Sequence, residues 1–445
     1  MHRMDSKAEF FNGKRITLMG LGLLGRGVGD AKFLAEAGAE LIITDLKDDE
    51  QLRASLDELK HFSNIRYRLG GHELEDFRDR DFILKAAGVP IDSLYIKEAR
   101  NNGIPIKMSA SWFAELSEIP VVGVTGTRGK STVTHLLEDI MKRAGMHVLL
   151  GGNVRGVSTL ALLPEVTQNS IALMELDSWQ CQGFGDAGLS PAVAVFTTFM
   201  PDHMNYYRDD LDLYLNDKAQ IFLNQKPDDS LIVGAQVAPV LKKKYGSKIL
   251  SHVVVADPAY FPSGWEISML GVHNLLNAMC AIETARALGI DEEVIKESVA
   301  TFKGVPGRLE FLREIHGVSI YNDNSSTTPE ATLAALRAIP GSRAILIMGG
   351  ADKGLSMQEL LSFVPAYAKR VILLTGSGTE RLVTSNIATF MNAPVYDRLE
   401  DALKDAMDSA VEGDLILFSP AFASFGMFNN EFDRGDQFVE LVKKL

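Results

Sequence analysis

The chain has 445 residues, which at roughly 150 residues per domain predicts about three domains and argues against a single small binding module. Its 45 Lys and Arg residues against 58 Asp and Glu residues give a net charge of −13, which argues against nucleic acid or an anionic membrane as the main partner. Composition is near the globular average, with 46% hydrophobic and 23% charged residues. Two cysteines, no apolar signal segment at the start and no long apolar run predict a cytoplasmic protein without membrane insertion.

Short apolar runs that end in turn residues alternate with amphipathic stretches along the whole chain. Such a rhythm predicts parallel strands joined by helices. Strands are expected at 16–22, 39–45, 81–88, 120–126, 171–176, 192–199, 318–323, 343–350, 371–376 and 414–418. Helices are expected at 27–38, 273–289, 329–339 and 399–411.

The predicted fold class is α/β with three domains, because the rhythm begins anew twice. Residues 1–118 are expected to form a Rossmann-like domain. Residues 119–302 are expected to form a central domain similar to phosphate-loop ATPases, with a mainly parallel sheet. Residues 303–445 are expected to form a second Rossmann-like domain.

The strongest motif is the segment Thr125–Thr132, TGTRGKST, which follows the apolar run VVGV and precedes a helical pattern over 131–144. Its glycines let backbone N–H groups face a triphosphate, Lys130 can reach the outer phosphates, and the Ser131 hydroxyl can hold Mg²⁺. Five residues separate Gly123 from Gly129, where the generic motif has four. The alternative is a chance Gly-Lys-Ser in a surface turn.

A second glycine motif follows the first predicted strand. Gly20, Gly22 and Gly25 have the spacing of a dinucleotide fingerprint, and Asp45 stands 20 residues beyond Gly25 at the end of the next strand. Asp45 could accept a hydrogen bond from a ribose hydroxyl or a base. A nicotinamide dehydrogenase is therefore one hypothesis, and a tight turn that needs small residues is the simpler one.

Glu175 and His203 are candidate metal ligands, because each follows the end of a predicted parallel strand and would face the same crevice as the phosphate loop. Mg²⁺ prefers oxygen ligands, which makes Glu175 the more usual choice. His203 could instead be a turn or capping residue, and Asp202 could cap the next segment.

Lys218 shares a helical face with apolar residues, which predicts that its amine points inward. The apolar positions on that face are Leu211, Tyr214, Leu215, Ile221 and Phe222. Burial lowers the pKa of an ammonium, and the resulting neutral amine can react with CO₂ to give a carbamate that ligates metal. The alternative is a side chain that runs along the apolar face to solvent.

Taken together, these motifs resemble the Mur ligase family over essentially the whole chain and in the same order. The segments that carry the resemblance are the phosphate loop, Glu175, Pro201-Asp202-His203, Lys218, His273–Ala278, Arg308, Asn322-Asp323 and Ser419–Ser424. The branch that adds glutamate to UDP-N-acetylmuramoyl-L-alanine is the most similar. In that context the N-terminal glycines would form a uridine-nucleotide pocket rather than a nicotinamide site.

The resemblance implies a role for individual residues. Lys130, Lys218, His203 and Glu175 would be catalytic, and the metal ligands would be Ser131, Glu175, His203 and Lys218 as carbamate. ATP would contact Gly126, Thr127, Gly129, Lys130, Ser131, Thr132, Asn274, Arg308 and Asp323. The UDP substrate would contact Leu21, Gly22, Thr44, Asp45, Asn153 and Gln180. The amino acid would contact Thr327, Lys353 and Ser424.

Three segments depart from the family pattern. Asp177-Ser178-Trp179-Gln180 stands where Ser-Ser-Phe-Gln is usual. In Asn322–Thr328 the usual lysine is replaced by Ser325. The segment Ser424–Glu431 also differs, and both of these changes fall where the amino acid would bind.

The resemblance implies an ATP-dependent ligase that adds D-glutamate to UDP-N-acetylmuramoyl-L-alanine through an acyl phosphate, in peptidoglycan precursor synthesis. It implies ATP and two Mg²⁺ ions, small-molecule substrates and a monomer. The alternatives are a Mur-type ligase for L-glutamate or another amino acid, a folylpolyglutamate-type ligase, a nicotinamide oxidoreductase and a nucleotide-binding protein without turnover.

Overall fold

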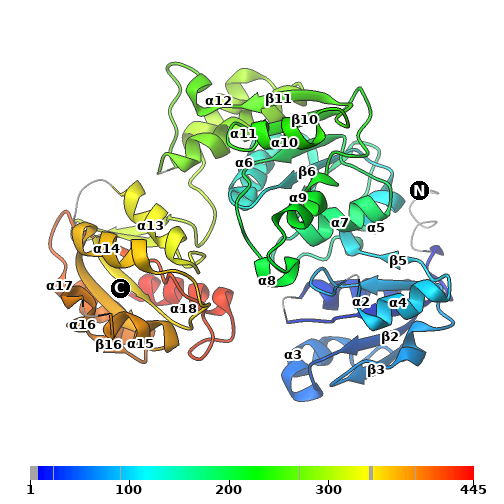
Figure 1. The fold of residues 1–445 in the computed structure, drawn as a ribbon, viewed down its shortest axis with the longest axis horizontal. Coiled ribbons are helices and arrows are strands. Elements are labelled where there is room, and N and C mark those ends of the chain that lie inside the picture. Colours follow the sequence, from blue (N-terminus) through cyan, green and yellow to red (C-terminus); the bar gives the residue numbers. More distant parts are fainter. Residues whose placement is uncertain (1–8, 24, 91, 270, 340–343, 386) are drawn as a thin grey trace. The chain divides into compact units, whose positions relative to one another are not determined.

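The computed structural model describes residues 9–23, 25–90, 92–269, 271–339, 344–385 and 387–445. These residues carry three sheets and divide into two compact units. The first unit contains the residues up to Gly264 together with Leu276–Ser298, and the second contains Trp265–Leu275 together with Val299–Leu445. Figure 1 shows the first two sheets in blue to green and the third in yellow to red.

The first sheet has five parallel strands in the order β3-β2-β1-β4-β5. The strands are β1 (Arg15–Met19), β2 (Glu40–Asp45), β3 (Ile65–Leu69), β4 (Phe82–Lys85) and β5 (Ile106–Lys107). The helices between and after them are α2 (Arg26–Glu36), α3 (Asp49–Leu59), α4 (Leu94–Asn101) and α5 (Ser109–Ser117). The strand order reverses between β1 and β4, and a doubly wound sheet binds its ligands at such a point.

The second sheet has six parallel strands in the order β11-β10-β9-β6-β8-β7. The strands are β6 (Val121–Thr125), β7 (His147–Gly152), β8 (Ser170–Glu175), β9 (Val193–Phe196), β10 (Ser230–Gly234) and β11 (His252–Ala256). The helices are α6 (Lys130–Arg143), α7 (Ser178–Asp186), α8 (Met204–Tyr207), α9 (Leu211–Ala219), α10 (Ala238–Tyr245), α11 (His273–Ala287) and α12 (Glu292–Thr301). Strands β6, β8 and β9 are apolar along almost their whole length because both faces of the sheet are covered.

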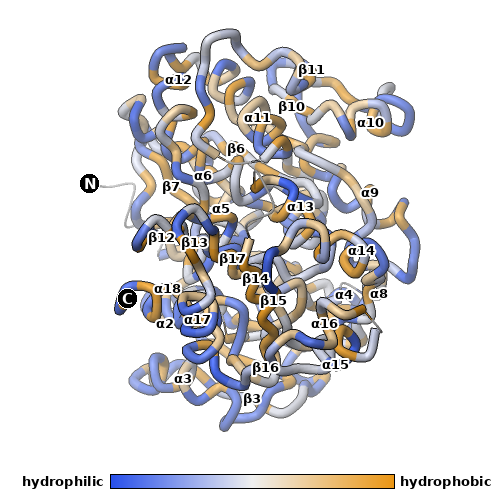
Figure 2. The backbone as a smooth tube through the Cα atoms, turned by 90° about the vertical axis from the view of Figure 1, so that its left-hand side faces the viewer, coloured by the Kyte–Doolittle hydropathy of each residue, from blue (hydrophilic) through white to orange (hydrophobic). Residues whose placement is uncertain are grey.

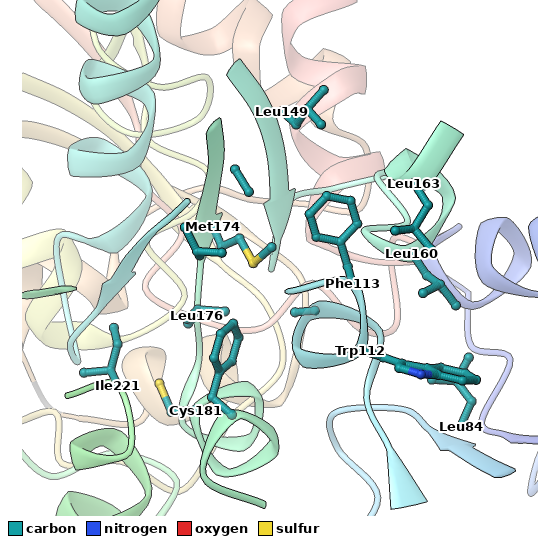
Figure 3. Close-up of a cluster of buried hydrophobic side chains, with 14 of the residues drawn as sticks. Leu84, Trp112, Phe113, Leu149, Leu160, Leu163, Met174, Leu176, Cys181 and Ile221 are labelled. Atoms are coloured by element: carbon teal, nitrogen blue, oxygen red, sulfur yellow. The ribbon is translucent and has the colours of Figure 1, made fainter. Parts of the chain in front are cut away.

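A single apolar cluster joins the first two sheets within the first unit. Leu84 on β4 and Trp112 on α5 belong to it together with Met174 on β8 and Leu160 (Figure 3). Trp112 is 1% exposed and packs edge-on against Phe11. The two sheets of the first unit therefore share one continuous apolar core.

The third sheet has six strands in the order β12-β13-β17-β14-β15-β16, and only β12 is antiparallel. The strands are β12 (Glu310–Ile315), β13 (Val318–Asn322), β14 (Ala344–Gly349), β15 (Ala368–Leu374), β16 (Val395–Tyr396) and β17 (Leu415–Phe418). The helices are α13 (Pro329–Ala338), α14 (Gln358–Tyr367), α15 (Ser377–Val383), α16 (Ala388–Met391), α17 (Leu399–Ser409) and α18 (Glu431–Lys444). In Figure 2 the orange backbone of β14 and β15 marks the apolar centre of this sheet.

The structure confirms the α/β fold class with mainly parallel sheets. Every strand expected from the sequence is present, with bounds shifted by a few residues, although residue 343 of the expected strand 343–350 lies outside the described residues. The four expected helices are present as well. Among the described residues, no helix combines the length and the apolar character that crossing a membrane requires.

Candidate active site

The phosphate loop lies between the central strand β6 and the helix α6, as the sequence predicts. Its backbone is held by the segment that follows β9: the Thr127 N–H donates to the Thr198 carbonyl at 2.8 Å, and the Arg128 N–H donates to Thr198 Oγ1 at 2.9 Å. The Thr197 hydroxyl donates to the Arg128 carbonyl at 2.5 Å. These bonds fix the loop before any ligand binds.

Two glycines of the loop leave no room for a side chain. Gly126 has φ 144°, and a Cβ there would lie 2.0 Å from Thr197 Oγ1. Gly129 has φ 89°, and a Cβ there would lie 2.3 Å from Asn277 Oδ1. Gly129 is the residue before α6, and no side chain caps that helix. The N-terminal turn of a 14-residue helix is therefore presented to a ligand at this loop.

Lys130 is the first residue of α6, and its side chain folds back over the loop. Nζ donates to the carbonyl oxygens of Gly126 at 3.0 Å and of Thr127 at 3.2 Å. Both of these acceptors are neutral carbonyl groups of the loop. A phosphate oxygen would be a stronger acceptor than either carbonyl.

The Lys218 side chain points inward, as predicted, and is 1% exposed. Its Nζ donates to the Gly126 carbonyl at 2.9 Å and to Thr125 Oγ1 at 3.3 Å. Burial, and to a smaller extent the charge of Lys130, lower the pKa of Lys218 to about 7. Its predicted apolar face is correct only in part, because α9 ends at Ala219 and Leu211 is 37% exposed.

Glu175 and His203 lie at the carboxyl edge of the second sheet. Glu175 ends β8, is 4% exposed and accepts a hydrogen bond from Asn153 Nδ2 at 3.3 Å. His203 has φ 53°, and its ring packs against Trp179 with 4.8 Å between the ring centroids. Burial lowers the pKa of His203, which favours the neutral imidazole that can ligate a metal.

Near the first sheet, a cavity of about 210 Å³ opens where the strand order reverses. Leu21, Gly22 and Gln180, three of the residues predicted to contact the UDP substrate, line it. Three ionisable side chains that the sequence reasoning missed, Arg26, Asp30 and Lys85, line it as well. Arg26 could have been predicted from the sequence, because it directly follows Gly25 of the glycine motif.

The other three residues predicted for this pocket do not line the cavity. Asp45 is 4% exposed, and its carboxylate accepts the Gly22 N–H at 3.1 Å and the Lys47 N–H at 2.9 Å, so it shapes the glycine turn. Thr44 is fully buried and donates to the Gly71 carbonyl at 3.2 Å. Asn153 reaches the cavity indirectly, since its Oδ1 accepts a hydrogen bond from Arg26 at 2.6 Å.

The second unit carries the remaining predicted ATP residues. Asp323, at the end of β13, is 4% exposed, and burial raises its pKa to about 6. Its carboxylate accepts the Ser419 hydroxyl at 2.7 Å and the Leu309 N–H at 3.0 Å. Arg308, the residue before Leu309, is exposed. Asn274, in the first turn of α11, is 8% exposed.

The second unit also brings the predicted amino-acid residues close together. Lys353 Nζ donates to Thr327 Oγ1 at 2.9 Å, across 26 positions of sequence. Ala351 and Ala423 exchange two backbone hydrogen bonds, of 2.9 and 3.0 Å, which hold the segment of Lys353 beside that of Ser424. An ammonium and two hydroxyl groups are thus presented on adjoining segments.

The phosphate loop of the first unit fits a nucleoside triphosphate. Its glycine backbone, the uncapped start of α6 and the Lys130 ammonium are the groups that bind phosphates. Among the described residues, no group of three or more His, Cys, Asp or Glu side chains is placed to hold a metal ion. Mg²⁺ still fits this donor set, because Mg²⁺ usually takes one or two protein ligands, with water and phosphate oxygens completing the shell.

The sequence matches two family models: the Mur ligase middle domain over residues 124–256 and the Mur ligase glutamate ligase domain over residues 307–422. The UDP-N-acetylmuramoylalanine–D-glutamate ligase of Roseiflexus sp. strain RS-1 is 36% identical, over 97% of this chain and 98% of that protein.

Two solved structures share the fold. The UDP-N-acetylmuramate–alanine ligase of Thermotoga maritima has a TM-score of 0.61 at 18% identity, with 97% of this chain and 99% of that chain covered. The MurF ligase of the same organism, in complex with ADP, has a TM-score of 0.58 at 17% identity, with 100% and 99% covered.

Proposed function

Because the chain belongs to the Mur ligase family, we propose that it adds D-glutamate to UDP-N-acetylmuramoyl-L-alanine in peptidoglycan precursor synthesis. It is an ATP-dependent ligase that forms an amide bond. The relatives give no support to a nicotinamide oxidoreductase, and the glycine motif of the first sheet is assigned to the uridine nucleotide.

One observation carries the proposal in structural terms: the phosphate loop is fixed on both sides before ligand binds. Thr197 and Thr198, in the segment that follows β9, hold its backbone, and Lys218 on α9 holds Gly126. A preorganised cluster of N–H donors and ammonium groups suits phosphoryl transfer, in which the protein chiefly positions groups and stabilises charge.

The reaction follows two steps. The terminal carboxylate of the acceptor attacks the γ-phosphorus of ATP, and ADP leaves to give an acyl phosphate. The amine of glutamate then attacks the acyl carbon, and inorganic phosphate leaves with formation of the amide. We assign Lys130 and the N-terminal turn of α6 to the charge that develops on the phosphoryl oxygens, with Gly126, Thr127, Gly129, Ser131 and Thr132 as the remaining phosphate-loop contacts.

Two Mg²⁺ ions would neutralise phosphate charge when bound, and Ser131, Glu175 and His203 are the residues we propose to hold them. Lys218 is proposed as a third contributor after conversion of its amine to a carbamate, which its burial and lowered pKa favour. Glu175 is held by Asn153, whose Oδ1 is held by Arg26 of the cavity. This chain of contacts would connect the acceptor pocket with the metal ligands.

The other assignments are proposals of the same kind. Leu21, Gly22 and Gln180 would contact the UDP substrate directly, with Asp45 and Thr44 shaping the turn and Asn153 acting beside Arg26. Asn274, Arg308 and Asp323 would contribute to ATP binding, and Thr327, Lys353 and Ser424 to amino-acid binding. We propose three domains with boundaries near residues 118 and 302, a monomer, and a cytoplasmic location, where ATP and nucleotide-linked precursors are available.

The test is ATP-dependent phosphate release with UDP-N-acetylmuramoyl-L-alanine, Mg²⁺ and a panel of D- and L-amino acids. We expect release to require both the acceptor and D-glutamate, and the product to contain one added glutamyl group by mass. Turnover with L-glutamate or another amino acid, and not with D-glutamate, would show that the protein is a Mur ligase with a different amino-acid specificity. ATP-independent hydride transfer would contradict the proposal entirely.

A further inference from the structure

Arg434 on α18 is an unusual residue in the second unit, because its guanidinium group is 1% exposed. Among the described residues it forms no ion pair, and its three hydrogen bonds go to neutral acceptors. Nε donates to Asn324 Oδ1 at 2.6 Å, Nη2 to the Asn324 carbonyl at 3.1 Å and Nη1 to the Phe422 carbonyl at 3.1 Å. Burial of an unpaired charge costs free energy, so a residue of this kind calls for an explanation.

The two residues that Arg434 holds belong to the two segments proposed to bind the amino acid. Asn324 lies three positions before Thr327, and Phe422 lies two positions before Ser424. The segments also meet directly, since the Ala421 N–H donates to the Ser326 carbonyl at 2.8 Å. One guanidinium therefore holds both the segment that carries Thr327 and the segment that carries Ser424.

The charge of Arg434 lies beneath a loop that lacks its own cation. Ser325, the residue next to Asn324, is neutral, and the segment Asn322–Thr328 contains no lysine or arginine. Burial lowers the pKa of Arg434 to about 10, so the group stays protonated at neutral pH. Its positive charge is transmitted through the Asn324 peptide and side-chain dipoles, and is poorly screened because the group is buried.

We propose that Arg434 is a positioning residue for the amino-acid substrate, and that it supplies from below the loop the positive charge that residue 325 does not provide. The inference rests on the proposed function for the nature of that substrate. Arg434 acts through Asn324 and Phe422, without contact to the reacting atoms. An acidic amino acid is then recognised by the exposed Lys353 ammonium, by neutral donors and by this buried guanidinium.

The test compares Arg434→Lys and Arg434→Gln with the parent protein in steady-state kinetics. The lysine variant retains the charge and loses the fork, and the glutamine variant loses both. We expect the KM for D-glutamate to rise by roughly tenfold in Arg434→Gln, because both proposed amino-acid segments lose the group that holds them, and by less in Arg434→Lys. The KM for the UDP acceptor should stay within about twofold, because its proposed contacts are in the first unit. The KM for ATP should rise less than that for D-glutamate, because Asp323, the proposed ATP contact next to Asn324, is held separately by Ser419 and the Leu309 N–H.

Val442→Ala is the matched control, since Val442 is 1% exposed on the same helix and packs in a different part of the core. It should lower the midpoint of thermal unfolding without a change in the KM for D-glutamate. A KM for D-glutamate within twofold of the parent value in both Arg434 variants would overturn the inference, and so would a parallel rise of all three KM values. If Arg434→Gln does not fold, the same criteria apply to Arg434→Lys. Failure of the parent protein to use D-glutamate would instead contradict the proposed function, and the comparison would then use the amino acid that the panel identifies.

Discussion

Nζ of Lys218 lies 2.9 Å from the carbonyl oxygen of Gly126, although 92 positions of sequence separate the two residues. The Lys130 ammonium donates to the same oxygen at 3.0 Å. Two lysines therefore share one acceptor in the phosphate loop, so their ammonium groups are close enough to repel each other. This proximity helps to keep the pKa of Lys218 low, at about 7, in addition to its burial.

The first prediction concerns Lys130→Ala. We expect a decrease in kcat on the order of 10² to 10³, because the variant loses a preorganised charge that stabilises the transferred phosphoryl group. The midpoint of thermal unfolding should change little, since Lys130 is partly exposed at the first position of α6. Lys142→Ala, on the same helix, removes an exposed partner of Glu138 and should leave kcat unchanged. Full turnover by a folded Lys130→Ala protein would exclude the phosphate-loop assignment.

The second prediction concerns the carbamate on Lys218. We expect Lys218→Ala to lose activity, and short carboxylates such as acetate to restore part of it by occupying the vacated anion position. Independently of turnover, ¹³C-labelled bicarbonate should give a carbamate resonance in the parent protein, absent from Lys218→Ala. A fully active Lys218→Ala protein would show that the buried amine has only a structural role.

Local patterns in the sequence predicted the phosphate loop well, because a strand, a glycine loop and a helix follow one another without interruption. They predicted the inward direction of Lys218 from the helical spacing of the apolar residues around it. The partner of its amine, Gly126, could not be predicted, since that contact depends on how β6 and α9 pack. In the same way, Arg434 and Asn324 are 110 positions apart, and no spacing rule relates them.

The strands that sequence reasoning missed are mostly at or near sheet edges. β11 is at one edge of the second sheet and is largely exposed, and β12 is the antiparallel edge strand of the third sheet. Edge strands lack the continuous apolar run of a doubly covered strand, so their pattern is weak. Asp45 was expected to accept a hydrogen bond from a ribose hydroxyl or a base. In the structure its carboxylate accepts the Gly22 and Lys47 N–H groups, and the contact with Gly22, 23 positions away, could not be predicted from the local sequence.

The third prediction tests how the side-chain carboxylate of the amino acid is recognised. Lys353 is the exposed cation beside Thr327, and an ammonium–carboxylate pair would favour glutamate over glutamine. We expect Lys353→Ala to lose most of this preference, measured as the ratio of kcat/KM for the two amino acids. Thr327→Val, which removes only the neighbouring hydroxyl, should weaken both amino acids more evenly. A preserved preference in Lys353→Ala would show that the charge is recognised by another group.

The fourth prediction concerns Asp30 on α2, which binds the hydroxyl groups of Ser109 at 2.7 Å and Ser158 at 2.6 Å through one carboxylate oxygen. Burial raises the pKa of Asp30 from 3.8 to about 6, against hydrogen bonds and the nearby charge of Arg26, which lower it. The folded state thus binds the proton more tightly than the unfolded state. The stabilisation from this group is complete below about pH 4 and is lost as the pH rises through about 6.

Asp30→Asn removes the titration while its amide oxygen can still accept both serine hydroxyl groups. Between about pH 4 and pH 7, the free energy of unfolding of the parent protein should therefore fall relative to that of the variant, by about 3 kcal/mol. Urea unfolding at a series of pH values measures this difference. Asp57→Asn, an exposed aspartate paired with Lys60, should follow the parent profile. Parallel profiles for the parent and Asp30→Asn proteins would contradict the prediction. They would mean that Asp30 ionises in the folded protein at no cost in free energy, although this structure buries its carboxylate against Ser109 of α5 and Ser158.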